Sequence, residues 1–168
     1  MIKKIGIKQN CFFMYSNYLL SFILFISLWS CKSNDNNAQN FIDSIQPKII
    51  SLGVDFKSDF NVFILTDNGC PACNHKYLDF IVDHVINKAN TVIYSTASGT
   101  NLDISPLLSD TINNLIRGDH DLIFRAKLDE HSYWVHIENQ KVDTIVALKA
   151  EGLDQTLDFL LEMQTKVR

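Results

Sequence analysis

The 168-residue sequence contains little cysteine, no excess of basic residues and no long hydrophobic run. Four cysteines are too few for a scaffold held together mainly by disulfides. A net charge of −4, from 15 basic and 19 acidic residues, argues against a nucleic-acid-binding protein, which usually carries a basic patch. With 46% hydrophobic and 20% charged residues, the composition excludes a disordered, collagen-like or polytopic membrane chain. The length and composition together indicate one globular domain.

Several motifs of large enzyme and binding families are also missing. The sequence has no glycine-rich phosphate loop, no Ser-His-Asp order of a hydrolase triad and no stripe of basic and aromatic residues. It shows no internal repeat and no basic run. We therefore expect no nucleic-acid partner, and the cysteines become the main candidates for chemistry.

Residues 1–30 differ from the rest of the chain. They contain three lysines and no acid, and residues 18–29 form a run of twelve residues without charge. This run is too short to span a hydrocarbon core, which needs about 20 residues. A basic start, a short apolar run and a polar continuation are typical of a secretory signal peptide.

The apolar run ends in Leu28-Trp29-Ser30-Cys31, which resembles the bacterial lipobox, although Trp29 is bulkier than the usual residue. The resemblance implies cleavage before Cys31 and lipidation of that cysteine. We therefore predict a lipoprotein signal peptide over 1–30, and a lipidated cysteine with a polar linker over 31–40. The alternatives are a retained anchor and a hydrophobic helix packed in the domain.

The predicted cleavage changes both the charge and the set of cysteines. The mature chain keeps 12 of the 15 basic residues and all 19 acidic residues, a net charge of −7. Cys11 is lost, which leaves Cys70 and Cys73 in an extracytoplasmic compartment where disulfides persist. Lys32 stands where an aspartate often signals inner-membrane retention in diderm bacteria. The predicted location is the cell envelope, with the outer membrane favoured as the site of the lipid anchor.

Hydrophobic periodicity predicts nine elements in the mature chain. They are helix 41–49, strand 62–66, helix 71–86, strand 91–95, helix 107–116, a short strand at 122–124, a hairpin of strands 133–138 and 142–148, and helix 153–161. Strands and helices alternate before an antiparallel hairpin. This order predicts an α/β fold, a three-layer α/β/α sandwich with a mixed central sheet.

Cys70-Pro71-Ala72-Cys73 lies where the first predicted strand ends and the amphipathic helix begins. Two intervening residues at a helix N-terminus let the sulfurs approach within bonding distance, so a Cys70–Cys73 disulfide is expected. Cys70 lies near unpaired backbone N–H groups and the positive end of the helix dipole, which favour its thiolate. Pro71 suits the first helical turn because it has no N–H to lose. We predict that Cys70 is the attacking nucleophile and that Cys73 resolves the mixed disulfide.

In this context the chain resembles the thioredoxin-like family, in which strand, CxxC, helix, strand, helix, hairpin and helix follow in this order. The resemblance covers about residues 55–165 and implies a thioredoxin-like domain, assigned here to 41–168. It implies that thiols and disulfides of envelope proteins are the partners, and that no organic cofactor is required. Two features differ from the family: Gly69 replaces a frequent tryptophan, and residues 130–133 contain no proline where a cis-proline is usual.

Two alternatives stay open for the CxxC motif. It can form a structural disulfide in a catalytically silent thioredoxin-like module that binds a partner in an envelope complex. It can also belong to a domain that handles copper or zinc, but a structural zinc site needs four ligands and His75 is the one histidine nearby. Haem attachment of the c type requires CxxCH, and Asn74 occupies the histidine position.

Four further residues are candidates for a role beside the cysteines. His75 and Lys76 follow Cys73 directly and add positive charge, although a solvated helix surface is the favoured interpretation. His131 lies in the stretch that faces the CxxC if the resemblance holds. Asp67 is placed to assist proton transfer to Cys73, but a turn residue needs no such role.

Overall fold

The computed structural model describes residues 32–166, with side chains from Asn36 to Gln164. The predicted signal peptide, 1–30, and the predicted lipidation site, Cys31, lie outside the described residues. Within residues 32–166, no helix is both long and apolar enough to cross a membrane.

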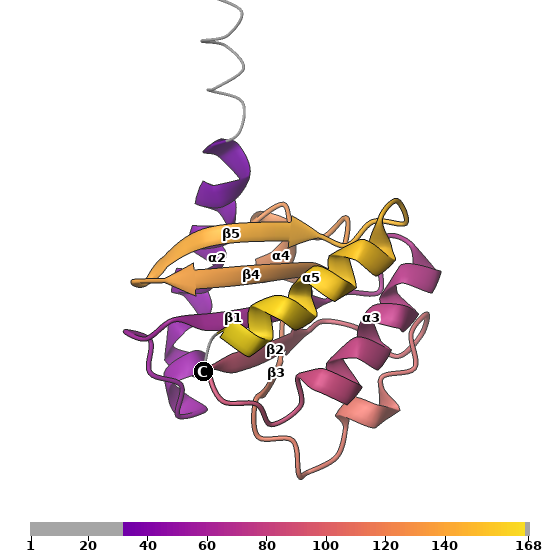
Figure 1. Cartoon of the computed structure of the whole chain (residues 1–168), viewed down its shortest axis with the longest axis horizontal. Coiled ribbons are helices and arrows are strands. Elements are labelled where there is room, and N and C mark those ends of the chain that lie inside the picture. Colours follow the sequence, from indigo (N-terminus) through magenta and orange to yellow (C-terminus); the bar gives the residue numbers. More distant parts are fainter. Residues whose placement is uncertain (1–31, 167–168) are drawn as a thin grey trace, which may run out of the picture. The chain divides into compact units, whose positions relative to one another are not determined.

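A single mixed sheet of five strands forms the middle of the described domain (Figure 1). The strand order is β3-β2-β1-β4-β5. The central strand β1 pairs in parallel with β2 and antiparallel with β4, β2 pairs in parallel with β3, and β4 and β5 form an antiparallel hairpin. The strands are β1 (Phe60–Leu65), β2 (Thr91–Ser95), β3 (Leu115–Arg117), β4 (Tyr133–Glu138) and β5 (Lys141–Ala147).

Helices cover both faces of this sheet. The described helices are α2 (Lys32–Ser51), α3 (Pro71–His84), α4 (His120–Arg125), α5 (Leu153–Lys166) and the short 3-10 helix η1 (Ser105–Leu107). In Figure 1, α3 and α5 lie in front of the sheet and α2 lies behind it. Strand β1 is buried on both sides because Val62 and Ile64 pack toward α2 and α4, whereas Phe63 and Leu65 pack toward α3 and α5. The predicted three-layer α/β/α fold with a mixed sheet is confirmed, and it is compatible with a thioredoxin-like sandwich.

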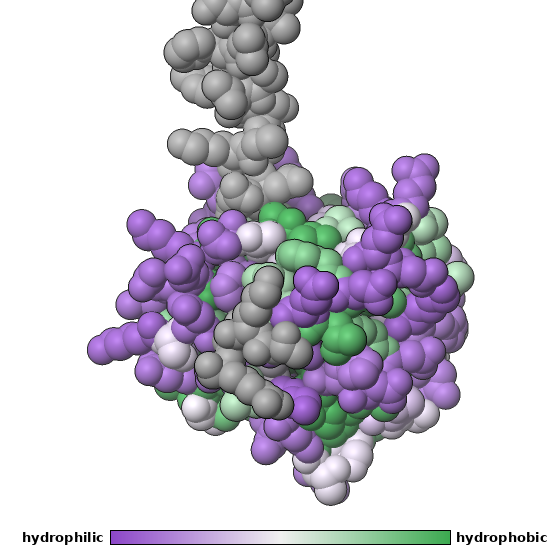
Figure 2. Space-filling view, viewed as in Figure 1, coloured by the Kyte–Doolittle hydropathy of each residue, from purple (hydrophilic) through white to green (hydrophobic). Residues whose placement is uncertain are grey.

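Helix α5 is fixed over the sheet by aromatic packing. The ring of Phe159 meets the buried ring of Trp134 edge-on, with centroids 5.8 Å apart. Phe159 and Leu161 nevertheless remain 41% exposed. On the face where α5 lies, Figure 2 shows hydrophobic residues interrupting a mainly hydrophilic surface.

Two predicted elements were wrong. The helix expected over 107–116 is replaced by η1, an irregular segment and strand β3. Its apolar residues do not share one face, because Leu107 packs on the α3 and α5 side of the sheet and Ile116 packs on the opposite side. The strand expected at 122–124 is helix α4, which begins after Asp119, whose carboxylate accepts a hydrogen bond from the N–H of Asp121.

A helix also occupies the segment 32–40, where the sequence predicted a polar linker. Helix α2 begins at Lys32 and continues through Pro47 to Ser51. Ala38 is fully buried. The side-chain carbonyl of Gln39 accepts a hydrogen bond from the N–H of Val142 at 2.7 Å, and its amide group donates to the backbone of the same hairpin. Tertiary contacts thus hold α2 against the sheet from its second turn onward.

Candidate active site

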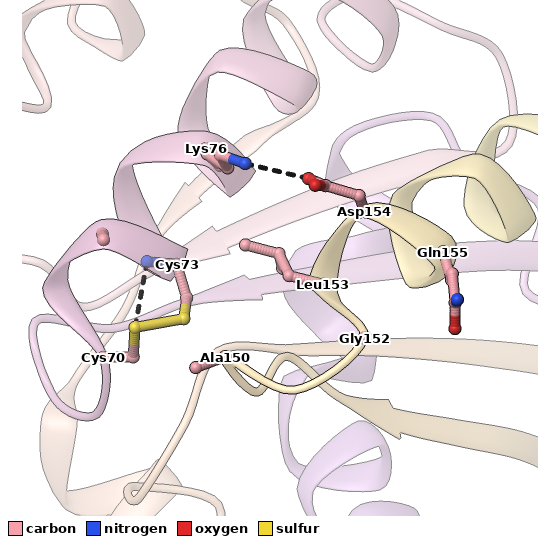
Figure 3. A pocket seen from close by; sticks show the side chains of 9 residues that line it. Cys70, Cys73, Lys76, Ala150, Gly152, Leu153, Asp154 and Gln155 are labelled. Atoms are coloured by element: carbon pink, nitrogen blue, oxygen red, sulfur yellow. Dashed lines mark hydrogen bonds and ion pairs between the residues drawn. A yellow bond between two sulfur atoms is a disulfide. The ribbon is translucent and has the colours of Figure 1, made fainter.

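The two cysteines of the CxxC motif lie at the junction of β1 and α3 and are joined by a disulfide (Figure 3). Their Cα atoms are 5.2 Å apart. Cys70 is the N-cap of α3: its backbone is extended, and its sulfur accepts a hydrogen bond from the N–H of Cys73 at 3.2 Å. Pro71 follows at the first helical position, where its missing N–H costs no hydrogen bond. The fold therefore brings together the two sulfurs that the spacing paired.

The two sulfurs differ in their accessibility. Cys70 is partly exposed, whereas Cys73 is 2% exposed and belongs to the core between the sheet and helices α3 and α5. A sulfur of another protein therefore reaches Cys70 before it reaches Cys73. In the reduced state, the N–H of Cys73 and the helix dipole both favour a thiolate on Cys70. Geometry and electrostatics thus favour the same cysteine as the nucleophile.

A cavity of about 380 Å³ opens beside the disulfide (Figure 3). Its walls are the first turns of α3, the first turn of α5 and the loop that leads into α5. Lys76 on α3 and Asp154 on α5 form an exposed ion pair of 2.9 Å across these walls. Two helix N-termini meet here, so their partial positive charges act on the same small region. The lining residues are Cys70, Ala72, Cys73, Lys76, Ala150, Gly152, Leu153, Asp154 and Gln155.

Gly69 brings a second loop against the backbone that precedes Cys70. Its φ is +87°, a conformation that disfavours side chains. A Cβ atom placed on Gly69 would lie 2.7 Å from the carbonyl oxygen of Glu130 and 3.2 Å from Nδ1 of His131. Only glycine therefore allows this close approach. His131 does lie next to the motif, as the resemblance implied, and the peptide bonds of the described residues are all trans.

Buried hydrogen bonds that the sequence analysis missed connect this loop to α3. Ser132 is fully buried; its Oγ accepts from the N–H of Thr66 at 3.2 Å and donates to Oδ1 of Asn74 at 2.8 Å. Asn74 is 3% exposed, and its amide group donates to the carbonyl of Asn68 at 2.8 Å. One signal was available in the sequence, because Asn74 extends the apolar stripe of Leu78 and later residues by one helical turn.

The other sequence candidates have ordinary structural roles. Oδ2 of Asp67 accepts two hydrogen bonds from Ser98, from its backbone N–H and from its hydroxyl, both at 2.7 Å. Asp67 therefore anchors the loop that follows β2. His75 and Lys76 lie on the exposed side of α3, and Lys76 contacts Asp154. Their positions match the solvated helix surface that was the favoured interpretation.

In residues 32–166, no cluster of three or more histidine, cysteine, aspartate or glutamate side chains is arranged to hold a metal ion. No protein-family model, no curated protein and no solved structure matches the chain. The functional assignment therefore depends on the geometry of the disulfide and its surroundings.

Proposed function

We propose that this protein is a thioredoxin-like lipoprotein of the cell envelope that carries out thiol–disulfide exchange through Cys70 and Cys73. The observation that carries the proposal is a disulfide at a helix N-terminus with one accessible sulfur and one buried sulfur. The bond joins cysteines three positions apart, so it closes a very short loop and constrains the unfolded chain little. Stabilisation is therefore a weak explanation for it, and exchange chemistry is the stronger one.

The exchange proceeds in two balanced steps. In the first, the Cys70 thiolate attacks one sulfur of a partner disulfide; that S–S bond breaks, one partner thiolate leaves, and a mixed disulfide forms. In the second, the Cys73 thiolate attacks the sulfur of Cys70, the second partner thiolate leaves, and the Cys70–Cys73 disulfide forms. Two electrons pass to the partner, whose two thiolates take up the protons released by the two cysteines. The reverse sequence oxidises a partner dithiol.

The groups around Cys70 assist both directions of this reaction. The N–H of Cys73 and the dipole of α3 stabilise the Cys70 thiolate, which favours its attack on a partner disulfide. In the reverse direction the same groups make Cys70 a good leaving group when the second thiolate of the partner attacks the mixed disulfide. No organic cofactor takes part, because the electrons come from the dithiol of a partner protein. The partners are thiols and disulfides of envelope proteins.

The envelope location depends on the N-terminal sequence. The basic start, the short apolar run and the lipobox-like ending at Cys31 support export and lipidation, and Lys32 supports the outer membrane as the anchoring membrane. Replacement of Cys31 by serine should release the protein from membranes in cell fractionation. Continued tight association of the Cys31→Ser variant would contradict a lipid anchor.

A trapping experiment tests the exchange function. In the Cys73→Ser variant, Cys70 still attacks but nothing resolves the mixed disulfide, so partners remain covalently bound. We expect adducts on non-reducing gels of alkylated envelope extracts, and we expect them to be absent from a Cys70→Ser, Cys73→Ser variant. In parallel, the purified wild-type dithiol should reduce a small-molecule disulfide.

The alternatives predict different results. If no adduct forms and the wild-type pair neither reduces a disulfide nor equilibrates with glutathione, the exchange function is wrong and a silent binding module remains. Stoichiometric copper or zinc on the reduced protein, lost on Cys70→Ser replacement, would instead support metal handling.

A further inference from the structure

Asn74 and Ser132 bury polar side chains in the core beside the cysteine pair, and core stability alone does not explain why polar residues stand there. Both side chains are almost completely inaccessible to solvent, at 3% and 0% exposure. Burial of polar groups costs free energy unless each group is hydrogen-bonded, and even then the net gain is small. Asn74 is also the one buried residue of α3 that does not belong to the hydrophobic core on this side of the sheet. The polar pair therefore calls for a reason beyond stability.

The hydrogen bonds of Asn74 converge on the backbone that carries Cys70. The side-chain amide of Asn74 donates to the carbonyl of Asn68 at 2.8 Å. Its backbone N–H donates to the carbonyl of Cys70 at 3.0 Å, a bond of the first helical turn that does not depend on the side chain. The side chain of Asn74 thus ties the backbone immediately before Gly69 to α3.

Ser132 adds a third fixed point on the same stretch of chain. It accepts from the N–H of Thr66 and donates to Asn74, so it links the end of β1 to the helix. The carbonyl of Glu130, two residues before Ser132, packs against Gly69. The segment from Thr66 to Cys70 therefore has little freedom to move relative to α3, on which Cys73 lies.

We propose that Asn74 and Ser132 are positioning residues for the cysteine pair. They hold Cys70 where Cys73 closes the disulfide, which raises the effective concentration of one thiol at the other. The dithiol needs no such proximity, so the network favours the disulfide over the dithiol and accelerates resolution of mixed disulfides. This inference rests on the proposed exchange function, and it deepens it by naming the groups that set the balance between the two redox states.

Two variants remove the shared hydrogen bond from opposite ends: Asn74→Ala and Ser132→Ala. Either one alone carries the test, so poor folding of one variant leaves the other. The chain also offers a matched control, because Asn114 is 4% exposed and equally hydrogen-bonded. Its side chain bonds to Asn87, Val85 and Thr91 beside the start of β2, whereas the cysteines follow the end of the parallel strand β1. Asn114→Ala therefore loosens the core without touching the cysteine pair.

The measurement is the equilibrium between the full-length protein, purified in detergent, and glutathione. The fraction of disulfide is trapped by alkylation over a series of reduced-to-oxidised glutathione ratios. We expect Asn74→Ala and Ser132→Ala to shift the equilibrium constant about tenfold toward the dithiol, which corresponds to about 30 mV. Their glutathione adducts at Cys70 should also resolve more slowly. For Asn114→Ala, the equilibrium constant with glutathione should differ from that of the wild type by less than about twofold. Its denaturant midpoint should nevertheless fall as much as those of the other two variants.

Three results would overturn the inference. Equilibrium constants of both network variants equal to wild type would reduce Asn74 and Ser132 to structural residues. A shift as large in Asn114→Ala would show that general loosening of the core is the cause. A wild-type pair that neither reduces a small-molecule disulfide nor equilibrates with glutathione, together with no adduct on Cys73→Ser, would remove both this inference and the proposed function. This result differs from the first two because it requires no substitution in the network.

Discussion

Gly69, the residue before the cysteine pair, allows a sharp test of how the active-site region is packed. An alanine at this position must adopt a φ near +87° and must place its Cβ 2.7 Å from the carbonyl oxygen of Glu130. Real Cβ atoms do not approach backbone oxygens this closely, so the loop 129–132 or the segment before Cys70 has to shift. The perturbation therefore combines backbone strain with a steric clash.

A second glycine separates these two effects. Gly53 has a similar φ of +81°, but a Cβ placed there has no heavy atom within 4 Å. Gly53→Ala should therefore cost only the backbone term, about 1–2 kcal/mol for a left-handed conformation. Gly69→Ala should cost this amount plus about 1–3 kcal/mol for overpacking. The difference between the two variants measures the contact between Gly69 and the loop.

The free energy of unfolding in urea, followed by the fluorescence of the buried Trp134, gives both values. We expect Gly69→Ala to be less stable than Gly53→Ala by at least about 1 kcal/mol, an accessible difference for a domain of ordinary stability. Equal destabilisation of the two variants would refute the close approach of Glu130 to Gly69. In that case the loop 129–132 would lie further from the cysteine pair than the structure has it.

Three other predictions address contacts away from the disulfide. Burial raises the pKa of Tyr77 well above its usual range, so the folded state retains a proton that the unfolded chain loses near pH 10. The contribution of Tyr77 to the free energy of unfolding is therefore fully present below pH 10 and falls as the pH rises above it. In Tyr77→Phe, the free energy of unfolding should therefore fall less steeply above pH 10, and an unchanged slope would contradict this. Gln39→Ala should cost about 0.5–1.5 kcal/mol and speed hydrogen exchange at the amide of Val142, whereas unchanged exchange would show that α2 is held by other contacts. Lys76→Ala should cost less than about 1 kcal/mol, with a smaller effect at high salt, because the ion pair with Asp154 is exposed; a larger loss would indicate a structural role for the pair.

Local signals were sufficient for the central features of the fold. The strand before the cysteines, the helix after Pro71 and the hairpin beginning at Tyr133 all depend on short-range periodicity, and all three were predicted from it. The elements over 107–116 and 122–124 were misassigned although at least half of their residues are apolar. In such short stretches, the side of the sheet on which each residue packs decides the conformation, and periodicity does not reveal that side.

The sequence by itself determined the cysteine pair, its position at a strand–helix junction and the alternation of elements that yields a three-layer sandwich, since each of these is encoded within a few turns of chain. Only the tertiary structure decided what surrounds the pair. Ser132 reaches Asn74 across 58 positions, and Gln39 reaches Val142 across 103. Such contacts join residues that are far apart in the sequence, and their pairing follows from how the sheet and helices pack. For this reason, the residues that hold the cysteines in place became visible only in the folded chain.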